Sequence, residues 1–206
     1  MFHKTINNLD LIKKEIQSKI SKLNYLNYNP KIIAICKTFP ISDVLPLINH
    51  GHVHFGENKV QESIEKWTDI KNDFKNIKLH MVGKLQTNKV KYVLPLFDYI
   101  HSLDNIKLAE KISNEQQKIG KKIKIFIQVN IGNESQKSGI LEENLSSFYR
   151  KCIKDFGLQI EGLMCIPPND NKSEIYFSKM RKLSEQINLS ELSMGMSDDY
   201  LKACEY

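Results

Sequence analysis

The 206-residue chain has very little arginine, which bears on its partners. Arg150 and Arg181 are its only two arginines, and its lysines are spread along the sequence rather than gathered between aromatic residues. Basic residues that bind nucleic acid usually form a patch or a known motif. The net charge of +6 therefore indicates a solvated, lysine-rich surface, and we expect no nucleic-acid partner.

The sequence also lacks long apolar runs and paired cysteines. A membrane span needs about 18 apolar residues, and the opening MFHKTINNLD has no apolar core of the signal-peptide type. We therefore expect a cytoplasmic protein without a membrane partner. Its four cysteines form no CxxC pair and lie among apolar residues, which indicates reduced, packed thiols rather than disulfides or a zinc site.

No stretch rich in proline, glycine or serine divides the chain, so we expect residues 1–206 to form a single domain. Short apolar runs alternate with longer amphipathic ones. The expected strands are Ile32–Cys36, His52–Phe55, Leu79–Val82, Tyr99–Leu103, Ile123–Asn130, Gln159–Ile166 and Glu191–Met194. After an opening helix that spans Ile6 to Leu23, the expected helices are Ser42–Asn49, Lys59–Asp69, Lys89–Leu96, Asn105–Ile119, Glu142–Phe156 and Asn171–Ile187.

This alternation predicts an α/β fold with a parallel sheet, because strands separated by helices are joined by right-handed crossovers. A closed TIM-type (β/α) barrel is the expected architecture. An open doubly wound sheet usually has a glycine-rich first turn, and none is present.

In such a barrel the chemistry lies at the carboxyl ends of the strands, where Lys37 and the segment 193–199 fall. A glycine-containing turn that leads into a helix can bind a phosphate through its backbone N–H groups. Alternatively, Ser197 caps that helix, and Asp198 and Asp199 satisfy its dipole. A phosphate site together with an inward lysine indicates a phosphorylated aldehyde, of which pyridoxal 5′-phosphate (PLP) is the one that forms imines with lysine.

Seven motifs in order resemble the pyridoxal phosphate homeostasis protein family, which has the barrel of the alanine racemase N-terminal domain. They cover nearly all of the chain from Ile32. The motifs are A-x-x-K-T at 34–38, F-G-E-N-x-V-Q-E at 55–62, H-x-x-G-x-L-Q-x-N-K at 80–89, H-S-L-D at 101–104, Q-V-N at 128–130 with K-S-G at 137–139, G-L-M-x-I-P at 162–167, and L-S-M-G-M-S-D-D at 192–199.

The resemblance implies a cofactor site made of Lys37, Asn58, His80, Met164, Ser193, Met194 and Gly195. Lys37 would hold PLP as a Schiff base, and Asn58 would lie beside the pyridine ring. His80 and Met164 would line the pocket. Ser193 would bind the phosphate with help from the backbone that follows it.

The resemblance also implies a function. Family members bind and buffer PLP without established turnover, so we expect a monomeric, non-catalytic protein of vitamin B6 homeostasis, with PLP and PLP-dependent apo-enzymes as partners. A PLP-dependent amino-acid racemase is the alternative, although the domain that carries the opposing tyrosine base of alanine racemase is missing here. A phosphate-binding barrel without PLP is a third possibility.

The family pattern continues into an eighth strand of the type R-I-G-[ST], whereas this sequence stops at Tyr206. We therefore expect a barrel without its eighth strand, with an unpaired seam between its first and last strands.

Three further features have alternative interpretations. His50, His52 and His54 alternate and could share one face of a strand, but no carboxylate or cysteine completes a metal site, so we expect none. Glu57 is either a general base or a carboxylate that anchors a loop, and the second is favoured. Met194 and Met196 are expected to pack rather than to react.

Overall fold

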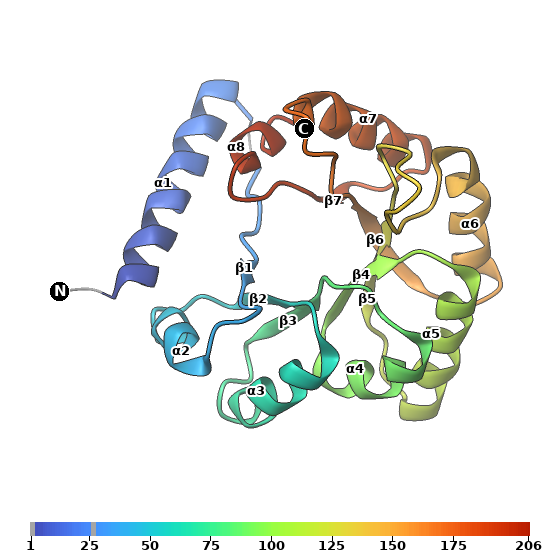
Figure 1. Ribbon diagram of the computed structural model, residues 1–206, viewed down its shortest axis with the longest axis horizontal. Helices are drawn as coiled ribbons and strands as arrows, with labels where there is room; N and C mark the ends of the chain where they lie inside the picture. The colour runs from blue at the N-terminus through green and yellow to red at the C-terminus, as the bar shows by residue number, and fades with distance from the viewer. Residues whose placement is uncertain (1–2, 26–27) are drawn as a thin grey trace.

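The computed structural model describes residues 3–25 and 28–206, which form a curled parallel sheet with helices around its outside (Figure 1). The seven strands pair in chain order. They are β1 (Ala34–Ile35), β2 (His54–Glu57), β3 (Lys78–Met81), β4 (Tyr99–Leu103), β5 (Lys124–Gln128), β6 (Gln159–Met164) and β7 (Glu191–Ser193).

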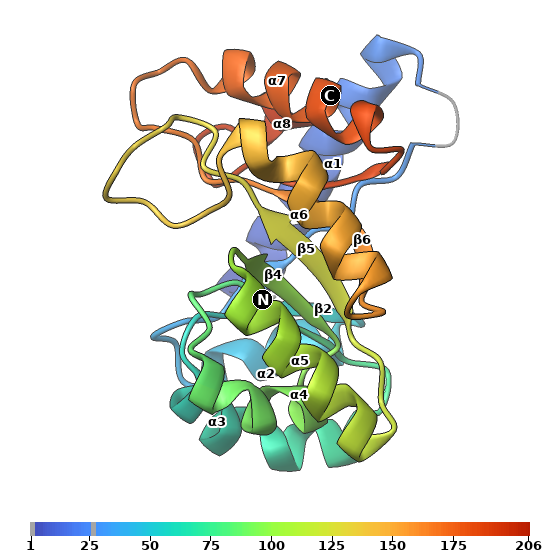
Figure 2. The ribbon, with the colours of Figure 1, turned by 90° about the vertical axis from the view of Figure 1, so that its right-hand side faces the viewer.

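The helices are α1 (Lys4–Leu23), α2 (Ile41–Asn49), α3 (Val60–Asp73), the 3-10 turn η1 (Thr87–Lys89), α4 (Val90–Leu96), α5 (Ile106–Ile119), α6 (Glu142–Lys154), α7 (Ser173–Gln186) and α8 (Tyr200–Ala203). Figure 2 shows α5 and α6 in front of the strands that they cover. Every strand and helix expected from the sequence is present, and the bounds of β4 are those predicted. The (β/α) barrel class is confirmed.

Local signals in the sequence account for both ends of α5. The side chain of Asn105 accepts a hydrogen bond from the backbone N–H of Leu108 and so caps the start of α5. At the other end of that helix, Gly120 takes the left-handed conformation at φ 65°, which glycine adopts without steric cost. None of the described helices is both long and apolar enough to cross a membrane.

The sheet has two edges, β1 and β7. Across residues 3–25 and 28–206, no ladder of hydrogen bonds joins these two strands, in agreement with the expected seven-stranded barrel. Figure 1 shows α1 and α8 beside each other on this side of the ring, and the two helices are in contact. β1 is shorter than predicted, because an edge strand has a partner on one side only and just Ala34 and Ile35 pair with β2.

Alternation along the strands separates two environments. Phe55 on β2 is fully buried and packs on Trp67 of α3, with ring centroids 5.1 Å apart. Because successive side chains of a strand point to opposite faces, His54 points away from α3 into the barrel. His80 on β3 and His101 on β4 contact one another there. The barrel therefore has an apolar layer under its helices and a polar group of side chains inside.

Candidate functional site

Lys37 follows β1, and the backbone before and after it is constrained. The N–H of Cys36 donates to the Gly56 carbonyl at 2.9 Å, and Nζ of Lys66 donates to the Cys36 carbonyl at 2.7 Å. Thr38 has a φ of 68°, in the left-handed region that non-glycine residues rarely adopt. Lys37 itself is exposed at the carboxyl end of β1.

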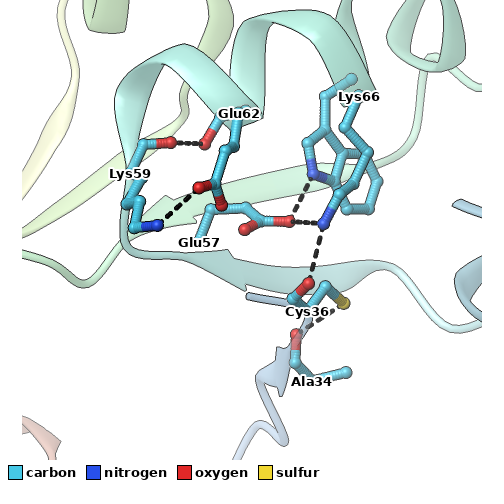
Figure 3. Close-up of polar contacts among 8 residues, drawn as sticks. Ala34, Cys36, Glu57, Lys59, Glu62 and Lys66 are labelled. Carbon is cyan, nitrogen blue, oxygen red and sulfur yellow. Dashed lines mark hydrogen bonds and ion pairs between the residues drawn. The ribbon is translucent and has the colours of Figure 1, made fainter. Parts of the chain in front are cut away.

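Glu57 is the anchor of this region (Figure 3). Its side chain is fully buried, and Oε1 accepts hydrogen bonds from Nζ of Lys66 at 2.7 Å and from Nε1 of Trp67 at 2.9 Å. Because Lys66 also holds the Cys36 carbonyl, the ion pair ties α3 to the end of β1. Glu57 thus faces the helix layer, which agrees with an anchoring carboxylate rather than a general base.

The cysteines are free and buried, as predicted. The one nearest to Lys37 is Cys36. Burial, reinforced by the charge of Glu57, raises the pKa of its thiol to about 12. This thiol therefore stays protonated at neutral pH and is not a nucleophile beside the lysine.

Asn58 lies directly after β2, where its loop is pressed against the loop that follows β3. A Cβ atom added to Gly83 would lie 2.1 Å from the Asn58 carbonyl oxygen, so only glycine permits this approach. The side-chain Oδ1 of Asn58 is buried and has no hydrogen-bond partner within the described part of the chain. A buried acceptor of this kind can receive a hydrogen bond from a ligand.

Histidines and a serine form a hydrogen-bonded chain through the barrel. Nδ1 of His54 lies 3.0 Å from Nε2 of His80, and Nδ1 of His80 lies 2.9 Å from Nε2 of His101. Nδ1 of His101 lies 2.8 Å from Oγ of Ser193. We call these four residues the histidine relay. It connects β2 with the carboxyl end of β7.

Burial keeps the inner rings of the histidine relay neutral. It lowers the pKa of His80 to about 2, an effect to which the neighbouring His101 contributes, and it lowers the pKa of His101 to about 3. Aromatic rings hold both imidazoles in place. Tyr99 stacks on His80 with centroids 4.2 Å apart, and Phe126 stacks on His101 at 4.5 Å.

The proposed phosphate turn follows β7. Met164 is buried and pairs with Ser193 in the β6–β7 ladder, whereas Met194 is half-buried. Gly195 has a φ of 85°, and a Cβ there would lie 2.8 Å from Cβ of Ala203, so the turn requires glycine.

The short helix after this turn is capped differently from the sequence alternative. α8 begins at Tyr200, and its N-cap is Asp199 rather than Ser197. Oδ1 of Asp199 accepts a hydrogen bond from the backbone N–H of Met196 at 2.6 Å. This carboxylate therefore occupies one backbone donor of the loop, and the interpretation of Ser197 as the cap is wrong.

The three alternating histidines have separate partners. Nε2 of His50 contacts Asp10, Nε2 of His52 contacts the carbonyl oxygen of His54, and His54 belongs to the histidine relay. In the described ranges, no group of three or more His, Cys, Asp or Glu side chains could hold a metal ion.

The predicted site residues fall into two groups. His80, Met164 and Ser193 are linked through the histidine relay and the β6–β7 ladder, and Met194 and Gly195 follow directly. Lys37 and Asn58 follow the neighbouring strands β1 and β2.

The first group therefore lies around the edge strand β7, and the second follows the edge strand β1 and its neighbour β2. Sequence reasoning missed the part that His54 and His101 play. Their signal is the recurrence of histidine on the inner face of three successive strands.

The chain matches known proteins over most of its length. The family model of the alanine racemase N-terminal domain matches residues 9–206. The pyridoxal phosphate homeostasis protein of Haemophilus influenzae is 37% identical over 203 residues, which are 93% of this chain and 85% of that protein.

Two solved structures have the same fold. A protein of Bifidobacterium adolescentis described as unknown has a TM-score of 0.90 at 27% identity, covering 97% of this chain and 88% of its own. PipY of Synechococcus elongatus with PLP bound has a TM-score of 0.77 at 31% identity, covering 91% of this chain and 92% of its own.

Replacement of Lys66 should lower the free energy of unfolding far more than replacement of a nearby exposed lysine. Lys66→Met leaves the Glu57 carboxylate buried without its partner, and we expect the free energy of unfolding to fall by about 3–5 kcal/mol. Glu57→Gln combined with Lys66→Met should recover more than half of that loss, because an amide oxygen can still accept from Trp67. The matched control is Lys59→Met, which breaks the exposed pair with Glu62 and should change stability by less than about 1 kcal/mol.

Urea unfolding of the four proteins measures these differences. Equal losses for Lys66→Met and Lys59→Met would contradict the anchoring role of the buried pair.

Stability should decrease as the pH falls from 7 to 5. An imidazole in the unfolded chain has a pKa of about 6.5 and takes up a proton in this window, whereas His80 and His101, with pKa values of about 2 and about 3, do not. The unfolded state thus binds more protons, and each ring lowers the free energy of unfolding by about 2 kcal/mol. Urea titrations at both pH values measure the loss, and His80→Gln should reduce it by about 2 kcal/mol. Stability that stays constant or rises toward pH 5 would contradict this assignment.

Proposed function

The chain belongs to the pyridoxal phosphate homeostasis proteins, which have the alanine racemase N-terminal domain, and we propose that it binds PLP in vitamin B6 homeostasis. One observation carries the proposal. Lys37 and Ser193, which suit the two ends of PLP, lie at the carboxyl ends of the edge strands β1 and β7. The PLP-bound structure of PipY supports the choice of ligand.

The residues present fit this cofactor. When bound, PLP supplies an aldehyde that condenses reversibly with a primary amine. Lys37 offers an exposed amine on a backbone held by Lys66. Asn58 has a buried side-chain oxygen without a partner, suited to a polar position beside the ring.

The other end of the proposed site suits a phosphate. Ser193 would offer a hydroxyl to the phosphate, and Gly195 lets the chain after β7 turn closely against Ala203 of α8. Met164 and His80 would form the wall of the pocket, and the backbone at Met194 would lie beside the phosphate.

We propose a binding protein rather than a racemase. Proton transfer on both faces of an amino acid needs two available bases. Both ring nitrogens of His80 and of His101 are used within the histidine relay. The hydroxyl of Tyr200 donates to Glu15, and this hydrogen bond raises the pKa of Tyr200 to about 12.

These groups are therefore poorly suited to accept a substrate proton. The names of the relatives, which are homeostasis proteins, support the same choice. In this proposal the chain is a single-domain, monomeric, cytoplasmic carrier that passes PLP to PLP-dependent apo-enzymes.

Lys37→Ala should abolish covalent attachment of PLP. The wild-type protein mixed with PLP should turn yellow and, after borohydride reduction, carry the cofactor on the peptide that contains Lys37. Lys84→Ala is the matched control, because Lys84 is also an exposed lysine that follows a strand, β3. We expect the control to keep the adduct and Lys37→Ala to lose it, as measured by peptide mass spectrometry. A stoichiometric reducible adduct in Lys37→Ala would show that the assignment is wrong.

A further inference from the structure

The histidine relay crosses the interior of the barrel. His54 is the first residue of β2, at the amino end of the sheet, and Ser193 is the last residue of β7, at the carboxyl end. Between them, His80 and His101 use both of their ring nitrogens in the chain. The inner rings are almost fully buried, with 3% and 1% of their surface exposed, and are held by stacked aromatic side chains.

A chain of neutral imidazoles has only two consistent directions, because each ring has one N–H donor and one acceptor nitrogen. In the first, His54 donates to His80, His80 donates from Nδ1 to His101, and His101 donates from Nδ1 to Oγ of Ser193. In the second direction, Ser193 donates to His101, and both inner rings carry their proton on Nε2. Any mixture places two donors or two lone pairs against each other inside the barrel, which leaves buried polar atoms unsatisfied.

The direction decides what the Ser193 hydroxyl can offer to a ligand. In the first direction its oxygen accepts from His101, so its hydrogen is free to donate outside the relay. In the second its hydrogen is already used. A phosphate dianion has acceptor oxygens only, so it is compatible with the first direction and not with the second.

We propose that His101, supported by His80 and His54, is a positioning residue that sets the Ser193 hydroxyl to donate to the phosphate of PLP. The inference rests on the proposed function and extends it to residues deep in the barrel. The relay also gives the serine a more polarised hydroxyl, because hydrogen bonds in series strengthen one another. In this proposal the preference of the protein for PLP over pyridoxal depends on His54, at the amino end of β2.

His54, at one end of the histidine relay, can be substituted without changing a residue proposed to contact the ligand. His54 is half-buried and lines a surface cavity of about 350 Å³ between α1 and the start of β2. Lys13 of α1, Ile32 and His52 also line this cavity. A substitution at His54 therefore acts on Ser193 through two intervening rings.

The tautomers of the inner rings are the direct test. In protein labelled with ¹⁵N-histidine and saturated with PLP, the imidazole ¹⁵N shifts should show His80 and His101 both protonated on Nδ1 and not on Nε2. Because free histidine prefers the other tautomer, a merely structural role would not produce this result in both rings. Protonation on Nε2 in both rings of the PLP complex would overturn the proposal.

A pair of isosteric variants tests the effect on binding. His54→Asn keeps a side-chain N–H that can donate to His80, whereas the carboxylate of His54→Asp can only accept and should reverse the relay. We expect His54→Asp to bind PLP at least about tenfold more weakly than His54→Asn, since a hydrogen bond to a charged group is lost. Pyridoxal, which has no phosphate, should bind both variants equally. Absorbance titrations with the two ligands give the dissociation constants.

Ser193→Ala separates failure of the relay from failure of the proposed function. This variant should weaken PLP binding by at least about tenfold, because it removes the same hydrogen bond to a charged group, and leave pyridoxal unchanged. If Ser193→Ala behaves in this way but the His54 variants bind PLP equally, the relay alone is wrong. If the wild-type protein does not bind PLP, the proposed function fails and the inference fails with it.

Discussion

The register of the parallel strands is the constraint on which the other features depend. Gly56 pairs with His80, and His80 pairs with Tyr99, so the inner faces of β2, β3 and β4 are aligned residue by residue. Side chains alternate with a period of two, and a slip of one residue would turn Phe55 into the barrel and His54 toward α3. The same pairing therefore protects the apolar layer and assembles the histidine relay. Stability and the candidate site cannot be separated in this fold.

Two sets of buried polar side chains in this protein are connected by hydrogen bonds. An imidazole nitrogen without a partner inside the barrel would cost about 1–3 kcal/mol, and the relay avoids this cost by pairing histidines with one another and with Ser193. On the helix side of the sheet, the Glu57 carboxylate accepts hydrogen bonds from the ammonium group of Lys66 and the indole N–H of Trp67. Each set lies next to a residue predicted to bind the ligand. The histidine relay ends at Ser193, and Lys66, the partner of Glu57, holds the backbone carbonyl of Cys36, which precedes Lys37. The two sets thus hold the residues that we propose for the two ends of the site.

Much of the fold could be predicted from the sequence, because the apolar period and the strand–helix alternation are local signals. The length of β1 could not, since an apolar run does not show how many of its residues pair at a sheet edge. The histidine relay could not be predicted either. Which histidines come into contact depends on the register between neighbouring strands, and the periodicity of the sequence does not give that register. The start of α8 could not be predicted either, because Ser197, Asp198 and Asp199 are all residue types that favour the N-cap position, and the helix begins after Asp199.

The two edge strands connect binding with the integrity of the barrel. Among the described strands, β1 and β7 each pair on one side only, so this part of the sheet has fewer interactions that resist local opening. Under the proposed function, a single ligand is held by Lys37 beyond β1 and by Ser193 on β7. Such a ligand binds only when both edges are in place, so its binding free energy is added to the stability of the closed arrangement. The cofactor would then be part of the structure across the seam as well as the cargo of the protein.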